Sequence, residues 1–507
     1  MMRVLFLGDS PKAIPSCDRL FQMQKLEWEM HPSLGLISNI LPPHPALHAV
    51  AILATIIRNH GFEVDVLEGA MHARQRKKLC EYLAKQPDVV CISTTFILHA
   101  DQIKPLIAIV RERVPQCKII LGGPGLLDRS DLREWGDYCV LGEGEECIVP
   151  LLRAIEGGQE NISIPGVWYR AKNGHIVENP PAISMVMDSL PLPDWSLLKR
   201  IPDEYFSIAT QRGCRWRCVY CTYPHNEGYK LRYRSIPNLL DEIRANYDKF
   251  GIRKYIISDS TFNHPQDRCT EFLEQAAKLS LPLEFWAYAR VDMMTPRMAE
   301  AMVCAGVKCL FFGLESGDDR ILSKMKKGFT TEQIRKGIRM LDGTGILRLG
   351  SWIVGFPGET METVQNTQNF IIEVNCELNA IQLFSLLDSA AVGQRKESFH
   401  VKGSHVEWQH DTMSSTDAAW HLEAVLSACL RNRVSVHNSG DLMRFQTIGW
   451  SFHRAHDFLR TVQLLFSVEA GLLPEPADWN RKKSEVSAAF EEIKKLSALH
   501  PFYQTGI

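Results

Sequence analysis

The chain has 507 residues, of which 45% are hydrophobic and 23% charged, a composition typical of a folded globular protein rather than a disordered or fibrous one. Its 57 Lys and Arg residues nearly balance 59 Asp and Glu residues, and the net charge of −2 argues against a protein that binds nucleic acid through its phosphates. No apolar run approaches the roughly 20 residues that a membrane span requires, and no signal-peptide core is evident. We therefore expect a cytoplasmic protein with no nucleic-acid partner and no membrane partner.

Residues 1–157 alternate short apolar runs with amphipathic stretches, as βαβ units around a parallel sheet do. The expected strands are 3–7, 63–67, 89–93, 118–121 and 139–141, and the expected helices are 45–60, 75–86, 102–114 and 145–155. This pattern predicts an α/β fold whose first domain, 1–157, is a doubly wound, Rossmann-like sheet. Ligands of such sheets bind outside the carboxyl ends of the strands.

The rest of the chain divides into three parts. Residues 158–203 are expected to form a linker with a hairpin, because two strand-like runs flank the turn signal Asn173–Gly174. From 204 to 390 a second alternating series predicts six strands, at 206–210, 255–258, 284–289, 309–313, 348–354 and 381–386. Six units are fewer than the eight of a closed barrel, so we expect a partial (β/α)6 barrel with its chemistry at the carboxyl ends of the strands. In residues 391–507, apolar positions at helical spacing predict a small helical C-terminal domain, or cap.

Three of the 14 cysteines form a C-x3-C-x2-C pattern directly after an expected strand: Cys214, Cys218 and Cys221. In a chain of this kind, cysteines indicate reduced thiols or metal ligands rather than a disulfide scaffold. Three thiolates cannot fill the four positions of a structural zinc site by themselves. They can hold three irons of a [4Fe–4S] cluster and leave the fourth iron open for another ligand.

This pattern resembles the signature of the radical S-adenosylmethionine (SAM) superfamily, in which an aromatic residue precedes the last cysteine, as Tyr220 does here. The segments 257–260, 313–317 and 354–360 follow later strands and are similar to further motifs of that family. The resemblance implies that the three cysteines are catalytic, since the cluster they hold cleaves SAM reductively. It also implies a set of SAM-binding residues: Tyr220, Asp259, Ser260, Arg290, Glu315, Ser316 and Gly355.

The first domain is similar to the cobalamin-binding branch of radical SAM enzymes, because small residues follow three of its strands and 32–36 lies upstream. The resemblance implies these cobalamin-binding residues: Ser93, Thr94, Thr95, Gly122, Gly123, Pro124, Gly142, Glu143, Gly144 and Glu145. Residues 1–157 lack the D-x-H-x-x-G motif whose histidine binds cobalt in many corrinoid proteins. We therefore expect base-off cobalamin, and a vestigial domain that binds none remains the alternative.

Taken together, the resemblance implies a cobalamin-dependent radical SAM methyltransferase. It would use SAM both as methyl donor and as the source of a 5′-deoxyadenosyl radical, and would methylate an unactivated carbon (or phosphinate) of a small metabolite. An external one-electron reductant of the flavodoxin or ferredoxin type would supply electrons. Two alternatives stay open: a cobalamin-dependent oxidative cyclase or rearrangement enzyme that does not methylate, and a non-catalytic iron–sulfur sensor or interaction module.

Overall fold

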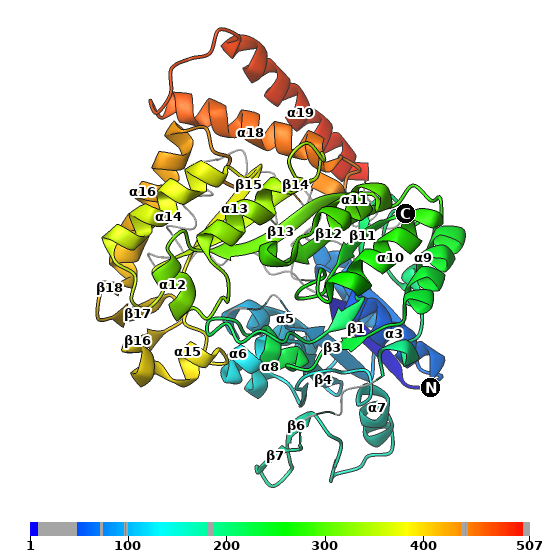
Figure 1. Cartoon of the computed structure of the whole chain (residues 1–507). Coiled ribbons are helices and arrows are strands. Elements are labelled where there is room, and N and C mark those ends of the chain that lie inside the picture. The colour runs from blue at the N-terminus through cyan, green and yellow to red at the C-terminus, as the bar shows by residue number, and fades with distance from the viewer. Residues whose placement is uncertain are drawn as a thin grey trace.

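The computed structural model describes residues 1–8, 48–70, 75–95, 97, 100–180, 182, 186–437, 442 and 445–499. The segment 32–36 and the start of the helix expected at 45–60 lie outside these residues. Figure 1 shows two large sheets, an N-terminal one in blue to cyan and a central one in green to yellow, with helices in orange and red at the C-terminal end. Among the described helices, none is long and apolar enough to span a bilayer.

The N-terminal sheet has a parallel core with the strand order β2-β1-β3-β4-β5. These strands are β1 (Arg3–Gly8), β2 (Glu63–Glu68), β3 (Val89–Ser93), β4 (Lys118–Gly122) and β5 (Tyr138–Val140). Strand β1 faces two separate cores, because Val4 and Phe6 pack on one side of the sheet while Leu5 and Leu7 pack on the other. Helices cover both faces: α3 (His48–Asn59), α4 (Arg76–Ala84), α5 (Ala100–Arg113), α6 (Gly125–Asp128) and α7 (Ile148–Glu156). The predicted doubly wound, Rossmann-like sheet is confirmed.

The predicted hairpin is present, but it belongs to the first sheet rather than to a separate linker. Its strands, β6 (Val167–Arg170) and β7 (Ile176–Glu178), run antiparallel and extend the sheet beyond β5. The physical reason is burial: Val167, Trp168 and Tyr169 are all buried, so β6 must pair with the edge of β5 instead of lying in solvent. The domain boundaries at 157, 203 and 390 stay a prediction.

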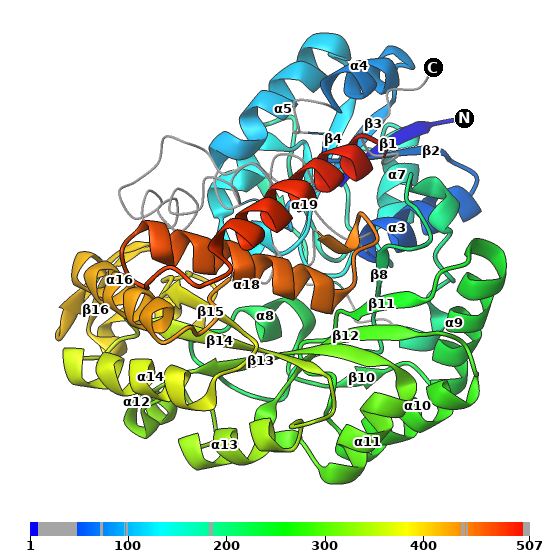
Figure 2. The ribbon, with the colours of Figure 1, turned by 90° about the horizontal axis from the view of Figure 1, so that it is seen from above.

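The central sheet is a partial barrel of six parallel strands in chain order, as predicted. The strands are β8 (Tyr205–Ile208), β11 (Lys254–Ile257), β12 (Glu284–Ala289), β13 (Val307–Glu315), β14 (Leu347–Val354) and β15 (Leu378–Leu383). Between and after them lie α9 (Ile236–Phe250), α10 (Gln266–Lys278), α11 (Pro296–Ala305), α12 (Asp319–Lys324), α13 (Thr331–Arg339) and α14 (Met361–Val374). Inward-facing Ile256, Trp286 and Leu349 share one core with the C-terminal helices, which lie across the open side of the sheet in Figure 2.

The C-terminal part contains the predicted helices and also a small sheet that the sequence does not predict. The helices are α15 (Ala391–Gln394), α16 (Ser415–Arg431), α18 (Phe452–Glu469) and α19 (Trp479–Leu499). The antiparallel strands are β16 (Val401–Ser404), β17 (Glu407–His410) and β18 (Met413–Ser414). The predicted helical cap is therefore present, and the small sheet is an addition to it. Each of these strands is at most four residues long and offers a single large apolar side chain, which is too little for a period-two pattern.

Candidate functional site

The three cysteines lie on one loop that a short two-stranded ribbon closes. Strand β9 (Gln211–Arg212) leads into the loop, α8 (Tyr223–Glu227) follows the last cysteine, and β10 (Arg232–Tyr233) returns antiparallel to β9. We call residues 213–231 the cysteine loop and β9 with β10 the ribbon. Cys214, Cys218 and Cys221 are half-buried and form no disulfide. The sequence-predicted cluster ligands are thus brought together at the mouth of the barrel.

Glycine and hydrogen bonds fix the start of the cysteine loop. Gly213 has a φ of +93°, and a Cβ there would lie 2.3 Å from the carbonyl oxygen of Lys230, so only glycine fits. The Gly213 N–H donates to the Glu227 carboxylate at 3.1 Å, and the Cys214 N–H donates to the Gly228 carbonyl at 3.0 Å. Burial raises the pKa of Glu227 to about 7. The two ends of the loop are therefore tied together.

Asp259 and Ser260, predicted to bind SAM, also hold this loop. The buried Asp259 carboxylate accepts hydrogen bonds from the backbone N–H groups of Thr210 (2.7 Å) and Gln211 (3.1 Å), and from the Thr210 hydroxyl. Burial raises the pKa of Asp259 to about 6. The Ser260 hydroxyl donates to the Gly213 carbonyl at 3.0 Å. Both residues act as positioning residues for the loop, and their contact with SAM stays a prediction.

The three thiols are free and half-buried, and one of them lies where ionisation is costly. Burial, with a smaller contribution from the neighbouring Cys218 and Cys214, raises the pKa of Cys221 to about 12. A metal cluster binds thiolates, so it relieves the cost of ionising thiols at such a site. Among the described residues, no group of three His, Cys, Asp or Glu side chains is arranged around a single metal ion. Cluster binding by the three cysteines stays a prediction.

A buried triangle of polar side chains lies beside the cysteines. The Tyr220 hydroxyl donates to the Glu315 carboxylate at 2.8 Å, and the Lys327 ammonium donates to both the Glu315 carboxylate and the Tyr220 hydroxyl at 3.0 Å. Gly313 makes room for this group, because a Cβ there would lie 2.3 Å from Glu315 Oε1. Although burial opposes its charge, the Glu315 carboxylate and the nearby Cys218 raise the pKa of Lys327. Tyr220 and Glu315 were predicted site residues, and the structure brings them into contact.

Lys327 is the residue that sequence reasoning missed. In the sequence it stands beside Lys326 and close to Lys324, and nothing in the pattern separates it from these two exposed lysines. Only the fold shows that its ammonium is buried and directed at Glu315. A glycine at the inward-facing position 313 is the one signal that could have indicated a crowded polar site there.

Arg290 also contacts the cysteine loop. Its guanidinium pairs with Asp292 at 3.0 Å, donates to the Lys327 carbonyl at 2.9 Å and lies over the Trp216 ring, 4.2 Å from the ring centroid. Trp216 belongs to the cysteine loop, so this stacking holds the loop against the third barrel strand. The contact of Arg290 with the SAM carboxylate stays a prediction.

The last two predicted SAM residues shape backbone turns. Ser316 is fully buried, and its hydroxyl lies 3.1 Å from the Thr367 hydroxyl. Gly355 has a φ of +94°, and a Cβ there would lie 2.6 Å from the Trp408 ring, so glycine is required. The Gly355 N–H donates to the buried Glu359 carboxylate, whose pKa burial raises to about 8. Their contacts with SAM likewise stay predictions.

The loops at the carboxyl ends of β3 and β4 pack directly on one another. The Thr94 hydroxyl donates to the Gly122 carbonyl at 3.0 Å, and the hydroxyls of Ser93 and Thr95 lie 3.0 Å apart. Gly123 has a φ of +112°, and a Cβ there would lie 3.1 Å from the Thr95 nitrogen. Small residues are therefore needed at this edge, where a doubly wound sheet binds its ligand. Pro124 directly precedes α6, whose first residue is Gly125.

The loop after β5 combines small residues with two engaged carboxylates. A Cβ on Gly142 would meet no heavy atom of the described residues within 4 Å, and one on Gly144 would contact Leu53 at ordinary distance. The carboxylates of Glu143 and Glu145 pair with arginines of the ribbon. Cobalamin binding by the ten predicted residues stays a prediction, and for these two carboxylates the structure shows a different set of partners.

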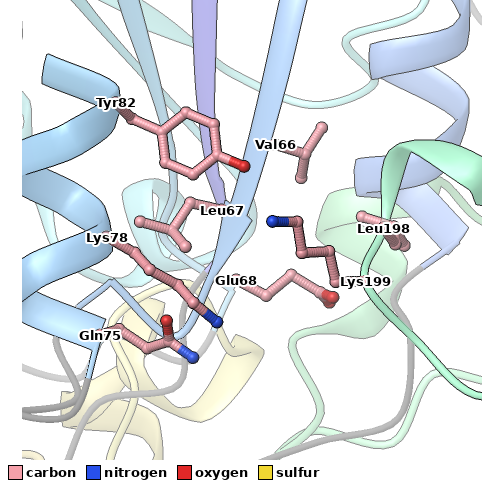
Figure 3. A pocket seen from close by; sticks show the side chains of 8 residues that line it. All are labelled: Val66, Leu67, Glu68, Gln75, Lys78, Tyr82, Leu198 and Lys199. Carbon is pink, nitrogen blue, oxygen red and sulfur yellow. The ribbon is translucent and has the colours of Figure 1, made fainter. Parts of the chain in front are cut away.

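A small cavity lies beside β2, close to the linker (Figure 3). Its volume of about 20 Å³ has room for about one water molecule, which is far too small for SAM or cobalamin. Its lining residues are Val66, Leu67, Glu68, Gln75, Lys78, Tyr82, Leu198 and Lys199. This cavity is therefore no candidate for either cofactor.

Comparison with known proteins agrees with this layout. Residues 36–152 match the B12 binding domain family, and residues 208–371 match the radical SAM superfamily. The chain is 28% identical over 364 residues to an uncharacterized methyltransferase of Pyrococcus horikoshii, covering 69% of this chain and 78% of that protein. It is 24% identical over 436 residues to cytidylyl-2-hydroxyethylphosphonate methyltransferase of Streptomyces wedmorensis, covering 72% and 80%.

The fold is similar to a solved structure of the radical SAM methyltransferase TsrM from Kitasatospora setae, bound to tryptophan and a SAM analogue. The TM-score is 0.67 at 19% identity, and the match covers 97% of this chain and 100% of that one. The likeness extends over the N-terminal sheet, the partial barrel and the C-terminal part. The predicted resemblance to cobalamin-binding radical SAM proteins is therefore confirmed for both domain families and for the fold.

Proposed function

The chain carries a B12-binding domain and a radical SAM domain, and on that premise we propose that it is a cobalamin-dependent radical SAM methyltransferase acting on an unactivated carbon (or phosphinate) of a small metabolite. The observation that carries the proposal is the direct junction of the two candidate cofactor sites. The loop after β5 of the B12-binding sheet is ion-paired to the ribbon that closes the cysteine loop. The names of the two relatives described above support transfer of a methyl group, because both are named as methyltransferases.

The cofactors would be held by different kinds of residues. Cys214, Cys218 and Cys221 would bind a [4Fe–4S] cluster, and Tyr220 with Glu315 would contact SAM beside it. The small-residue loops after β3, β4 and β5 would hold cobalamin at the edge of the first sheet. When bound, the cluster supplies the electron that cleaves SAM, and cobalamin carries the methyl group. The chain's own part is to place these groups, exclude water and hold the substrate.

The inner wall of the barrel supports a compact substrate. The alternation along the barrel strands places five residues on the inward face: Ser258, Tyr288, Phe311, Ile353 and Gln382. None of the five is fully buried, in contrast to Trp286 and Leu349 on the same face. The Tyr288 and Phe311 rings meet edge to face, with centroids 5.0 Å apart. All five side chains are uncharged, so we propose that the reacting part of the substrate is uncharged and has a flat or apolar face.

Electrons would come from an external one-electron donor of the flavodoxin or ferredoxin type. A cytoplasmic location and base-off cobalamin are further parts of the proposal. Base-off cob(II)alamin shows no nitrogen superhyperfine splitting in its EPR spectrum, so a protein-bound sample with that splitting would contradict this last part. A small-molecule substrate is the coarser part of the proposal.

The test is a count of the products of SAM. Transfer of a methyl group in place of a substrate hydrogen consumes two SAM and two electrons, and yields methylated product, S-adenosylhomocysteine, 5′-deoxyadenosine and methionine. The anaerobically reconstituted enzyme, given methyl-labelled SAM, should release about one S-adenosylhomocysteine and one 5′-deoxyadenosine per labelled product, whereas a nucleophilic acceptor changes only the 5′-deoxyadenosine count. A product with unchanged carbon count and no stoichiometric S-adenosylhomocysteine would instead favour the cyclase or rearrangement alternative. Neither nucleoside would favour the iron–sulfur sensor.

A further inference from the structure

Two carboxylates on the B12-binding sheet face the barrel instead of the open edge of their own sheet. Glu143 and Glu145 follow β5 and approach two arginines of the ribbon, Arg212 and Arg232. The Arg212 guanidinium lies 2.5 Å from the Glu145 carboxylate and 3.4 Å from the Glu143 carboxylate. Arg232 forms a two-pronged pair with Glu143, with one of the two contacts at 2.9 Å. We call these four residues the junction.

The junction is shielded from solvent. The side chains of Glu145 and Arg212 are 5% and 11% exposed, and those of Glu143 and Arg232 are 13% and 14% exposed. Ion pairs at this depth are screened little by salt, and removal of one partner leaves a buried charge without compensation. Surface pairs, in contrast, contribute little to stability or placement. The junction therefore fixes the two elements that carry it.

The ribbon and the loop after β5, which the junction connects, each border one of the two candidate cofactor sites. Arg212 directly precedes Gly213 and Cys214, where the cysteine loop begins. Arg232 stands where the loop ends, and it also donates to the Glu227 carbonyl within the loop at 3.1 Å. On the other side, Glu143 and Glu145 alternate with Gly142 and Gly144 at the carboxyl end of β5. Both ends of the cysteine loop are thus tied to one loop of the B12-binding sheet.

We propose that Glu143 and Glu145 are positioning residues that set the separation between the cluster and cobalamin, rather than cobalamin contacts themselves. This inference rests on the proposed function, because it needs both cofactors on the chain. It revises the role that the sequence predicts for these two residues. A methyl group and a substrate radical must meet within bonding reach, and a shift of about 1 Å can cost about 10²-fold in rate. Ion pairs across the domain boundary supply that precision.

The first experiment uses the apoprotein and so does not depend on either cofactor. Hydrogen–deuterium exchange is compared for the wild type, Glu143→Gln, Glu145→Gln and the double variant. Glu146→Gln is the matched control, because Glu146 belongs to the same loop, is exposed and has no ion pair among the described residues. We expect faster exchange at 211–233 in the junction variants only. Unchanged exchange in the double variant would overturn the proposal.

The second experiment measures the separation itself. In the loaded protein, pulsed EPR reports the dipolar coupling between the reduced cluster and cob(II)alamin. The junction variants should retain both cofactors but show a broadened or shifted coupling, while Glu146→Gln matches the wild type. Loss of cobalamin from Glu143→Gln, with exchange at 211–233 unchanged, would instead make Glu143 a cobalamin contact. A wild-type protein that retains no cobalamin would defeat the proposed function, while the exchange result would still stand by itself.

A third comparison excludes a general folding defect. Arg232→Met removes the other partner of Glu143, and the double variant Glu143→Gln/Arg232→Met removes both charges. If the two residues act through one pair, the double variant should exchange at 211–233 no faster than the worse single variant. With substrate, the junction variants should form 5′-deoxyadenosine that is not matched by product, so the ratio of the two should rise several-fold. Equal loss of both would indicate a merely structural role.

Discussion

In the barrel, charged and aromatic side chains hold the cysteine loop and its flanks, whereas in the B12-binding sheet the loops after β3 and β4 are joined by small hydroxyl side chains and backbone groups. Asp259, Arg290 and the Tyr220–Glu315–Lys327 triangle each reach a specific atom or ring of the cysteine loop or its flanks. The loops after β3 and β4 are joined instead by the Thr94 hydroxyl and a carbonyl, with a glycine where they touch. A cluster needs particular ligands, while a large planar cofactor needs a surface of the right shape. The first kind of site therefore leaves a motif in the sequence, and the second leaves mainly small residues.

The largest expected effect comes from the cluster ligands. The triple variant Cys214→Ala/Cys218→Ala/Cys221→Ala should lose the [4Fe–4S] absorbance and all formation of 5′-deoxyadenosine, because the three thiolates are the predicted protein ligands. Cobalamin binding should persist, since its loops lie on the other domain. Cys304→Ala offers a control, because Cys304 is exposed and lies on α11. A triple variant that still binds four irons and cleaves SAM would disprove the assignment.

The next largest effect is expected from Lys327. Lys327→Met leaves the buried Glu315 carboxylate without its cation and removes the hydrogen bond that the Tyr220 hydroxyl accepts, so kcat/KM for 5′-deoxyadenosine formation should fall by about 10–100-fold. Lys327→Arg, which keeps the charge, should recover part of the loss. Lys326→Met is the control, because that side chain is exposed. Equal losses in the two Met variants would show that the triangle has no special role.

A smaller and more selective effect is expected at the glycine of the B12-binding sheet. Gly123→Ala adds a Cβ 3.1 Å from the Thr95 nitrogen at a φ of +112°, a strain of about 1–3 kcal/mol that the loop must relieve by moving. Cobalamin affinity should fall about tenfold, while cluster content stays that of the wild type. Gly174→Ala is the control, because Gly174 also has a positive φ, +86°, but its Cβ would meet no atom of the described residues within 4 Å. Cobalamin titrations of both variants test this, and equal affinities would contradict it.

The same contrast explains what the sequence can and cannot predict. The parallel strands follow from periodicity and the three cysteines from their spacing, whereas Tyr220 and Glu315 follow from the resemblance to the radical SAM family. The junction pairs join residues 67 and 89 positions apart, and no local pattern records which Arg faces which Glu. The burial of Lys327 cannot be predicted from the sequence either, since it depends on the packing of two barrel loops. Strands β16 to β18 are not predicted from the sequence, because they are too short to show alternation of apolar and polar residues.

The smallest expected effect concerns pH and the turn after β14. Burial raises the pKa of Glu359 from 4.5 to about 8, although its carboxylate accepts hydrogen bonds from the Gly355 and Phe356 N–H groups. Between about pH 5 and pH 8 the unfolded chain has therefore lost a proton that the folded chain keeps. Stability conferred by this proton is complete below about pH 4.5 and is lost as pH rises through about 8.

The unfolding free energy of the wild-type apoprotein, relative to that of Glu359→Gln, should accordingly decrease between pH 5 and pH 8. Glu300→Gln, at an exposed position of α11, should follow the wild type. Denaturant titrations at pH 5, 6.5 and 8 measure the difference. Parallel profiles for wild type and Glu359→Gln would show that Glu359 ionises normally.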